Sequence, residues 1–385
     1  MIAPEPFFEP RGTPFSEYFR IKALCHAGHE VDLVTYPIGR DKDIKGLRIF
    51  RSLKPPLIKS VKTGPSPAKL FLDFFLFFKA WGRLCRGKYD VIHTHEEANI
   101  MGAFFSKISG VPHLYDMHSS LVQQMNNFQF TKSKLIVSFF RWIEKISLRN
   151  SQSTIVICRA LYDYAAKITD KEKLTIIENF IDDTPETIDA DKLKQIKEEI
   201  GSRQKKIIMY TGTLEAYQGI PLLIDTMKHL DGDFRLVLIG GKEEQVNQVK
   251  QKADDEGLSD RILVLGRKDP QDIPYYLKAS HVLVSPRILG TNIPLKIYSY
   301  LKSEIPVVAT DLYTHTQSID KDISILVEPE PEKFAQGIRD AVSEKGKRTA
   351  KKAGEFCREN YSFERYLELV TEALRKAAKK KGNRE

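Results

Sequence analysis

Residues 285–311 carry side chains and a spacing that could bind an anion. The segment reads as the end of an apolar strand, a loop with Gly290 and Asn292, a helix that opens at Pro294, and a second apolar strand. The first turn of a helix has unpaired amides and lies at the positive end of the helix dipole. Lys296 falls in that turn, where a cation is unfavourable unless an anion is bound. The segment therefore predicts a diphosphate site that includes Lys296.

Histidines and carboxylates close two predicted strands in the first half of the chain. One strand ends in His93, His95, Glu96 and Glu97, and a later strand ends near His118. The carboxyl ends of parallel strands form the crevice in which such sheets bind ligands, so we expect these side chains at a site. The i, i+2 spacing directs the first two histidines to one face without a third ligand in sequence, so no metal is predicted.

A loop near the beginning of the sequence is a weaker candidate. Gly12 precedes a predicted helix, with Arg11 beside it, and this loop could approach a phosphate or an acceptor. An ordinary strand-to-helix turn explains the same residues equally well. The strand before this loop is short, which predicts that the sequence begins late in its first strand.

The elements that position these residues alternate between strand and helix along the whole chain. Alternation of this kind predicts parallel, doubly wound sheets, and here the pattern occurs twice. We expect an acceptor-side domain at 1–182, a donor-binding domain at 183–360, and a C-terminal helix with a basic tail at 361–385. Gly212 and Gly219 flank a strand-to-helix loop, but the glycine fingerprint of a dinucleotide fold is absent from the sequence, which disfavours a nicotinamide enzyme.

Composition restricts the partners and the compartment. The chain has 385 residues, a formal net charge of +9 and a pI near 9.1, which favours an anionic partner such as a phosphorylated ligand or a membrane surface. No nucleic-acid-binding pattern occurs, so no nucleic acid is expected. The four cysteines are far apart and outside metal-ligand spacings, which predicts buried free thiols and a reducing, cytoplasmic location.

Two aromatic helices leave membrane contact open. The segment 69–85 is apolar nearly all round, which favours a buried helix over one against lipid. The segment 126–150 combines Lys132, Lys134, Arg141 and Lys145 with aromatic residues. A surface helix packed on its domain is the preferred interpretation, with an interfacial helix on anionic lipid as the alternative. The longest strongly apolar run, residues 71–78, is too short to span a bilayer.

Several motifs in a fixed order resemble glycosyltransferase family 4, a retaining family with two facing Rossmann-like domains (the GT-B fold). The similarity covers essentially the whole chain. The motifs that carry it are EPFFEPRGTP, GHEVDLVTYP, DVIHTH and GVPHLYDMHSSL in the first half, and YTGTLEAYQGI, LVLIGG, VLVSP, PLKIYSYL and PVVATD in the second.

The resemblance implies that a UDP- or GDP-sugar binds the second domain and an acceptor the first, with the reaction in the cleft between them and the final helix crossing back to the first domain. It places the donor diphosphate against Gly212, Thr213 and Gln218, and the base beside Gly266, Arg267 and Lys268. The start of the PLKIYSYL helix, with Pro294, Leu295 and Lys296, cradles the phosphates. It also places His118 near the donor sugar, Gly12 near donor and acceptor, and Arg11, His95 and Glu96 on the acceptor side.

This sequence departs from the family at four functional positions. The two signature glutamates correspond to Thr291 and Ser299, and an arginine and a lysine of the diphosphate loop correspond to Thr213 and Gln218. Arg287 and Lys296 add positive charge near the same site, and PLKIYSYL and YQG recur in a sub-branch of the family, so altered donor chemistry is favoured over lost activity.

The expected function is therefore sugar transfer to a lipid-linked or polysaccharide acceptor in cell-surface glycan synthesis. Protein cations would stabilise the leaving diphosphate, so neither a metal nor a cofactor is expected. The expected location is the cytoplasm, peripherally on the inner face of the cytoplasmic membrane. Two alternatives remain open: a non-catalytic sugar-nucleotide-binding scaffold, and an epimerase that would use Glu96 and Glu97 as acid and base.

Overall fold

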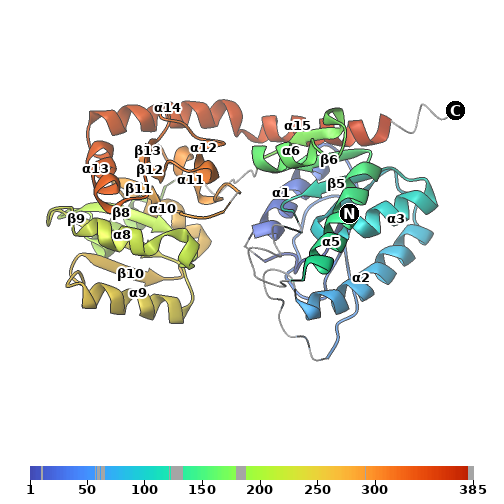
Figure 1. Ribbon diagram of the computed structural model, residues 1–385, viewed down its shortest axis with the longest axis horizontal. Coiled ribbons are helices and arrows are strands. Elements are labelled where there is room, and N and C mark those ends of the chain that lie inside the picture. The colour runs from blue at the N-terminus through green and yellow to red at the C-terminus, as the bar shows by residue number, and fades with distance from the viewer. Residues whose placement is uncertain are drawn as a thin grey trace. The chain divides into compact units, whose positions relative to one another are not determined.

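The computed structural model describes residues 1–9, 12–56, 58, 61, 66–120, 122, 133–178, 188–290 and 292–379. The chain divides into two compact units, the first formed by Met1–Phe180 with Phe363–Glu385 and the second by Ile181–Ser362 (Figure 1). Each unit has one parallel sheet with helices on both faces. The predicted fold class of two Rossmann-like doubly wound domains is confirmed.

The first unit contains a seven-stranded sheet in the order β3-β2-β1-β4-β5-β6-β7. Its strands are β1 (Ile2–Ala3), β2 (Val31–Thr35), β3 (Leu47–Arg51), β4 (Ile92–His95), β5 (His113–Met117), β6 (Ser153–Val156) and β7 (Leu174–Ile176). Five of these strands, β1, β2, β4, β5 and β6, are buried at every position, as expected for parallel strands covered on both faces.

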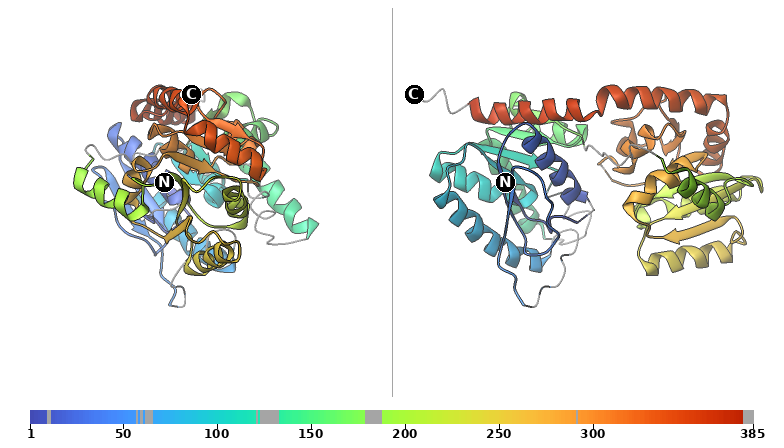
Figure 2. Two further views of the ribbon diagram at one scale, coloured as in Figure 1. Left: turned by 90° about the vertical axis from the view of Figure 1, so that its left-hand side faces the viewer. Right: turned by 180° about the vertical axis from the view of Figure 1, so that it is seen from behind.

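The helices of the first unit cover both faces of this sheet. They are α1 (Gly12–His26), α2 (Pro67–Arg86), η1 (Glu96–Ala98), α3 (Asn99–Ser109), α5 (Lys134–Asn150), α6 (Arg159–Ala165), η2 (Lys171–Lys173) and α15 (Phe363–Lys379). On one face, Val34 and Ile92 join a core with Leu72 of α2 and Phe105 of α3. On the other face, Leu33, Leu114 and Ile155 join a core with α1 and α15. The last helix of the chain therefore completes the first unit (Figure 2).

The second unit contains a six-stranded sheet in the order β10-β9-β8-β11-β12-β13. Its strands are β8 (Lys206–Thr211), β9 (Phe234–Ile239), β10 (Ile262–Gly266), β11 (Val282–Ser285), β12 (Val307–Thr310) and β13 (Ile325–Val327). Its helices are α7 (Ala190–Ile200), η3 (Ala216–Gln218), α8 (Ile220–Met227), α9 (Glu243–Asp255), η4 (Pro270–Asp272), α10 (Ile273–Lys278), α11 (Lys296–Lys302), α12 (Tyr313–Thr316), α13 (Pro331–Ala341) and α14 (Glu344–Asn360).

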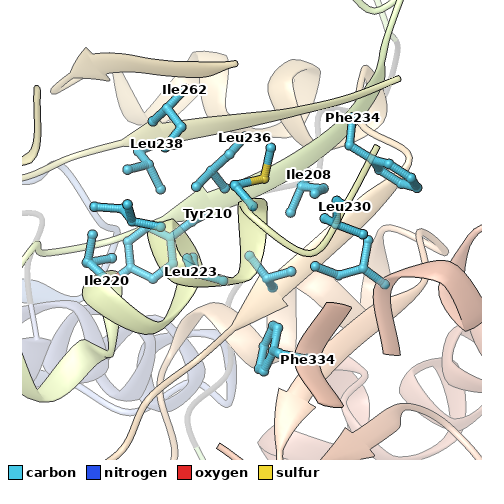
Figure 3. Close-up of a cluster of buried hydrophobic side chains, with 14 of the residues drawn as sticks. Ile208, Tyr210, Ile220, Leu223, Leu230, Phe234, Leu236, Leu238, Ile262 and Phe334 are labelled. Carbon is cyan, nitrogen blue, oxygen red and sulfur yellow. The ribbon is translucent and has the colours of Figure 1, made fainter. Parts of the chain in front are cut away.

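The core of the second unit lies between its sheet and helices α8, α9 and α13. Figure 3 shows part of this cluster, in which Tyr210 of β8 and Leu238 of β9 lie near Leu223 of α8. The ring of Tyr210 is fully buried, and its hydroxyl donates to the carbonyl of Thr213, 2.5 Å away. The core thus extends to the loop that follows β8.

The structure corrects three sequence-based expectations. Helix α11 begins at Lys296 rather than at Pro294. In α2, Leu72 and Leu76 face the core, whereas the phenylalanine face expected to be buried is largely exposed, because the sheet covers only one side of the helix. Cys158 and Cys357 are buried free thiols, but Cys25 is partly exposed and Cys85 lies exposed on α2.

Within the described residues, no helix is long and apolar enough to cross a bilayer.

Candidate functional site

The second unit has a crevice-forming position between β8 and β11. The strand order reverses there, because β9 and β10 lie on one side of β8 while β11, β12 and β13 lie on the other. Ligands of open α/β sheets bind outside the carboxyl ends of strands at such a point. The two loops that leave this point are residues 212–219 after β8 and residues 286–295 after β11. Both contain residues that the sequence predicted as donor-binding.

The two loops lie directly against each other. The amide of Ile288 donates to the carbonyl of Tyr217 over 3.0 Å. Gly219 has φ +76°, and a Cβ at this position would lie 2.1 Å from the carbonyl oxygen of Pro286. Glycine is required here both for the backbone conformation and for the close approach. The predicted diphosphate loop therefore contacts the loop that leads to Lys296.

The ammonium group of Lys296 lies beside these loops. Its Nζ is buried and has no hydrogen-bond partner, although the stem of the side chain is partly exposed. The Nζ lies 3.6 Å from the centroid of the Tyr210 ring, and a Cβ added to Gly212 would lie 3.1 Å from it. Burial, and then the nearby Arg287 charge, lower the pKa of Lys296 well below its usual value. An anion at this position would compensate both effects.

Arg287 shapes the loop after β11 and adds positive charge. Its Nε donates to the carbonyl of Leu289 at 2.7 Å and its Nη1 to that of Asn292 at 3.0 Å, while its guanidinium lies 5.2 Å from the centroid of the Tyr217 ring. Nearby, burial lowers the pKa of His315 to about 3, with the charges of Lys296 and Arg287 contributing. The carboxyl end of this sheet is therefore electropositive.

The backbone amides at the start of α11 contribute less to anion binding than the sequence predicted. The amide of Ile297 donates to the carbonyl of Pro294 at 3.0 Å, and the amide of Tyr298 donates to that of Leu295 at 3.3 Å. These two amides are therefore already paired within the chain. The side chains of Lys296 and Arg287 are the stronger anion-binding groups of the segment.

Of the other predicted donor-binding residues, one group lies in the loop after β8 and another at the end of β10. Gln218 is buried, and its Nε2 donates to the hydroxyl of Thr213 at 3.5 Å while its Oε1 has no partner. Lys268 forms an ion pair with Glu199 at 2.7 Å, and the exposed Arg267 donates to the carbonyl of Gly241. These last two residues follow Gly266 at the end of β10, the edge strand of the sheet.

The structure describes one of the two positions that correspond to the family glutamates. Ser299 lies partly exposed within α11, whereas Thr291 lies outside the described residues. The carbonyl of Asn292 accepts hydrogen bonds from Arg287 and from the hydroxyl of Thr314. Pro294 is buried, and Leu295 is the residue immediately before α11.

In the first unit, a buried network surrounds Asp116. Arg20 donates from Nε to Asp116 Oδ2 at 2.7 Å, and His93 Nε2 lies 3.3 Å from the same oxygen. His118 Nε2 lies 3.3 Å from Asp116 Oδ1 and 3.1 Å from His95 Nδ1. Burial lowers the pKa of His118 to about 4, so the imidazole is neutral at physiological pH. The network fixes His118 immediately beyond the carboxyl end of β5.

The geometry of this network disfavours metal coordination, although the ligand atoms of His93, His95 and Asp116 lie within 4.8 Å of one another. The rings of the two histidines are stacked, with centroids 4.8 Å apart and planes inclined by 19°, so their lone pairs do not converge on one point. Arg20 already neutralises the carboxylate. We therefore interpret the cluster as a hydrogen-bonded network that positions His118.

Carboxylates gather at the strand-order reversal of the first sheet, between β1 and β4. Lys69 pairs with Glu97 at 3.0 Å and with Glu5 at 3.4 Å. Glu96 is buried with φ +46°, an unusual conformation for a residue other than glycine, and accepts from the hydroxyl of Ser119 at 3.0 Å. Glu17 of α1 is fully buried, and neither of its carboxylate oxygens has a partner. Burial raises the pKa of both Glu96 and Glu17.

Sequence reasoning missed Arg20 and Glu17, and a signal for them was present. Both residues lie on α1 at i, i+3 spacing, and Leu24 follows one turn later on the same face. A charged pair on the apolar face of a helix indicates buried partners. The two predicted site residues before this helix add little to the description of the site. Arg11 lies outside the described residues, and Gly12 is the first residue of α1.

Two Rossmann-like units, one with cationic side chains and one with histidines and carboxylates at its strand-order reversal, have the architecture of the GT-B fold. Family models agree with this: residues 21–184 match Glycosyltransferase Family 4 and residues 191–359 match Glycosyl transferases group 1. The chain belongs to this family of retaining glycosyltransferases, and it is an enzyme that uses a nucleotide-sugar donor.

Three proteins that the chain resembles share only a small part of its sequence. A D-inositol 3-phosphate glycosyltransferase of Xylanimonas cellulosilytica is 22% identical over 282 residues, which cover 69% of this chain and 67% of that protein. The crystal structure of Anabaena HepE in complex with UDP has a TM-score of 0.75 at 15% identity, covering 97% of this chain and 98% of HepE. WaaG, a glycosyltransferase of lipopolysaccharide biosynthesis, has a TM-score of 0.70 at 13% identity, covering 96% and 99% of the two chains.

Proposed function

We propose that this enzyme transfers a hexosyl group from a UDP- or GDP-sugar to a lipid-linked or polysaccharide acceptor, with retention and without a metal. The leaving diphosphate would lie between residues 212–219 and Lys296. His118 would position the donor sugar rather than attack it. HepE, whose structures contain UDP and UDP-glucose, supports a uridine nucleotide as the first donor to test.

The observation that carries this proposal is the unpaired ammonium of Lys296. A buried cation without a hydrogen-bond partner is costly, so its presence at a strand-order reversal indicates a site that an anionic ligand completes. A leaving diphosphate develops negative charge during transfer, and a preorganised ammonium stabilises that charge more in the transition state than in the ground state.

The acceptor side of the proposal rests on the carboxylates of the first unit. Glu96 accepts a hydrogen bond from the hydroxyl of Ser119, and its carboxylate would accept one from a hydroxyl group of a sugar or polyol. Arg20 and Asp116 hold the neutral imidazole of His118 in place. This arrangement favours an acceptor whose reacting end carries hydroxyl groups rather than phosphate.

The proposed location is the cytoplasm, with the protein peripheral on the inner face of the cytoplasmic membrane. The four cysteines are free thiols, which suits a reducing compartment. A lipid-linked acceptor would present its sugar at that membrane face.

A donor screen tests the proposed function. The purified protein is incubated with UDP- and GDP-hexoses, and release of free nucleotide is followed with and without extracts of lipid-linked glycans as acceptors. We expect slow hydrolysis of one donor and faster release when an acceptor is present. Nucleotide binding without turnover of any donor would contradict the proposal and would favour the scaffold alternative, which the family membership now disfavours.

A further inference from the structure

Three helices of the first unit carry most of the exposed large apolar side chains. Among the described residues, twelve of the eighteen such side chains lie on α2, α3 and α5. They include Phe74 at 57% exposure, Trp142 at 58% and Leu135 at 83%. We call this set the α2–α3–α5 surface; its members are Leu70, Phe71, Phe74, Phe78, Trp81, Ile100, Phe104, Ile108, Leu135, Ile136, Phe139 and Trp142.

These helices are neighbours, and exposed rings of α2 and α3 contact each other. The ring of Phe104 on α3 lies 5.8 Å from that of Phe77 and 6.3 Å from that of Trp81, both on α2. The hydroxyl of Ser147 on α5 donates to Asn99 Oδ1 on α3 at 3.2 Å. Figures 1 and 2 show α2 and α3 side by side on the outside of the first sheet.

The core of the first unit does not use these side chains. The large apolar side chains that these helices bury are others: Leu72 and Leu76 of α2, Phe105 of α3 and Leu148 of α5. The exposed rings of α2 and α5, and the exposed apolar side chains of α3, repeat along each helix at spacings of three or four residues. An exposed apolar area that spans three helices indicates a binding surface.

The exposed charged side chains that the structure describes on these helices all have the same sign. Among their described side chains, every exposed charged one is basic; these are Lys79, Arg86, Lys107, Lys134, Arg141, Lys145 and Arg149. The two acidic residues of these helices face the interior. Asp73 accepts from the hydroxyl of Tyr36 at 2.6 Å, and the fully buried Glu144 accepts from that of Ser120 at 3.0 Å.

We propose that the α2–α3–α5 surface docks this enzyme onto an anionic lipid bilayer. Rings and aliphatic side chains would enter the interface, while the lysine and arginine heads would contact anionic headgroups. A second copy of the chain fits less well, because a two-fold contact would bring basic groups together without an acidic partner on these helices. The proposal refines the membrane location given above and rests on that part of the proposed function.

Vesicle flotation of the full chain tests the proposal. One set of vesicles is pure phosphatidylcholine, and the other contains about one third phosphatidylglycerol. The two test variants are Phe74→Ser with Phe78→Ser, and Arg141→Ser with Lys145→Ser. Matched controls in the second unit replace the exposed Ile188 and Tyr313, or the exposed Arg348 and Lys351, by serine. All of these side chains are exposed, and circular dichroism verifies that each variant is folded.

We expect the wild type to partition at least about tenfold more strongly onto the anionic vesicles than onto the neutral ones. Each test variant should lose at least about tenfold of that binding, while the controls should retain it. Failure of the wild type to float with either vesicle would overturn the proposal. Equal binding by the wild type and all variants would also overturn it. A third contrary result would be a wild-type dimer in sedimentation that the Phe74→Ser, Phe78→Ser variant no longer forms. Flotation needs no turnover, so its result is separate from that of the donor screen.

Discussion

At the residue scale, Lys296 and Asp116 represent two ways of placing a charge inside a protein. The ammonium of Lys296 has no hydrogen-bond partner within the described chain, whereas the carboxylate of Asp116 is held by Arg20 and lies 3.3 Å from the imidazoles of His93 and His118. The first arrangement leaves a charge that a ligand can neutralise. In the second, Arg20 already neutralises the carboxylate, and the network serves to hold His118.

The Asp116 network makes Arg20 a stability-determining residue. Arg20→Met leaves a fully buried carboxylate without its guanidinium, and this should lower the free energy of unfolding by about 3–5 kcal/mol. Urea unfolding measures the loss. In the matched double variant, Arg20→Met with Asp116→Leu, much of that stability should return, because no uncompensated charge remains. A loss below about 1 kcal/mol in the single variant would show that Arg20 does not hold the carboxylate.

At the scale of elements, the sequence predicted the strands and most helices because burial on both faces of a parallel sheet produces distinctive apolar runs. The apolar strands β8, β9 and β11 belong to the alternation of strand and helix that the sequence predicted. The outer face of α2 could not be predicted, because seven apolar residues around a helix do not reveal which side meets the sheet. The exposed Cys85 on α2 was unpredictable for the same reason.

The residues of the candidate site were predictable only where they belong to one continuous segment of the chain. Lys296 and Arg287 belong to one motif, and the sequence identified both. Tyr210, which lies beneath the ammonium, is a core residue by every sequence criterion. Arg20 meets Asp116 across 96 positions of the chain, a contact that only the fold creates.

The contact between the loops after β8 and β11 gives a prediction at this scale. Gly219→Ala would place a Cβ 2.1 Å from the carbonyl oxygen of Pro286 at a positive φ, so the two loops must separate. We expect the affinity for UDP to fall at least about tenfold and stability to fall by about 1–3 kcal/mol.

Calorimetric titration and thermal unfolding measure these two effects. Gly232→Ala is the matched control, because a Cβ there meets no atom within 4 Å. If Gly219→Ala behaves like this control, the close approach of the two loops does not matter for the nucleotide.

At the scale of the whole molecule, each unit contains a buried neutral histidine that predicts sensitivity to acid. Burial lowers the pKa of His113 in the first unit and of His315 in the second to about 3. An unfolded histidine takes up a proton below about pH 6.5, but these folded ones do not. Stability is therefore fully present above that pH and decreases as the pH falls towards 3, by about 2 kcal/mol per histidine at pH 5.

Urea unfolding at about pH 7 and pH 5 tests this acid sensitivity. His113→Gln and His315→Gln should each be less stable than the wild type near neutrality, because each loses a hydrogen bond to a threonine hydroxyl. Each variant should nevertheless lose about 2 kcal/mol less than the wild type between the two pH values. An unchanged difference would mean that the imidazole becomes protonated in the folded state.

The central claim is that the ammonium of Lys296 stabilises the leaving diphosphate, and the rate of Lys296→Met with the correct donor tests it most directly. Lys296→Met removes a buried ammonium that has no hydrogen-bond partner, and methionine still packs on the Tyr210 ring. The variant should therefore be about as stable as the wild type, so unfolding cannot explain a lost rate. Lys228→Ala is the control, since that exposed lysine pairs with Asp225 and Glu256 on the surface. We predict that kcat/KM for sugar transfer falls at least about thirtyfold, equivalent to about 2 kcal/mol, in Lys296→Met alone. A rate equal to that of the wild type would contradict the account.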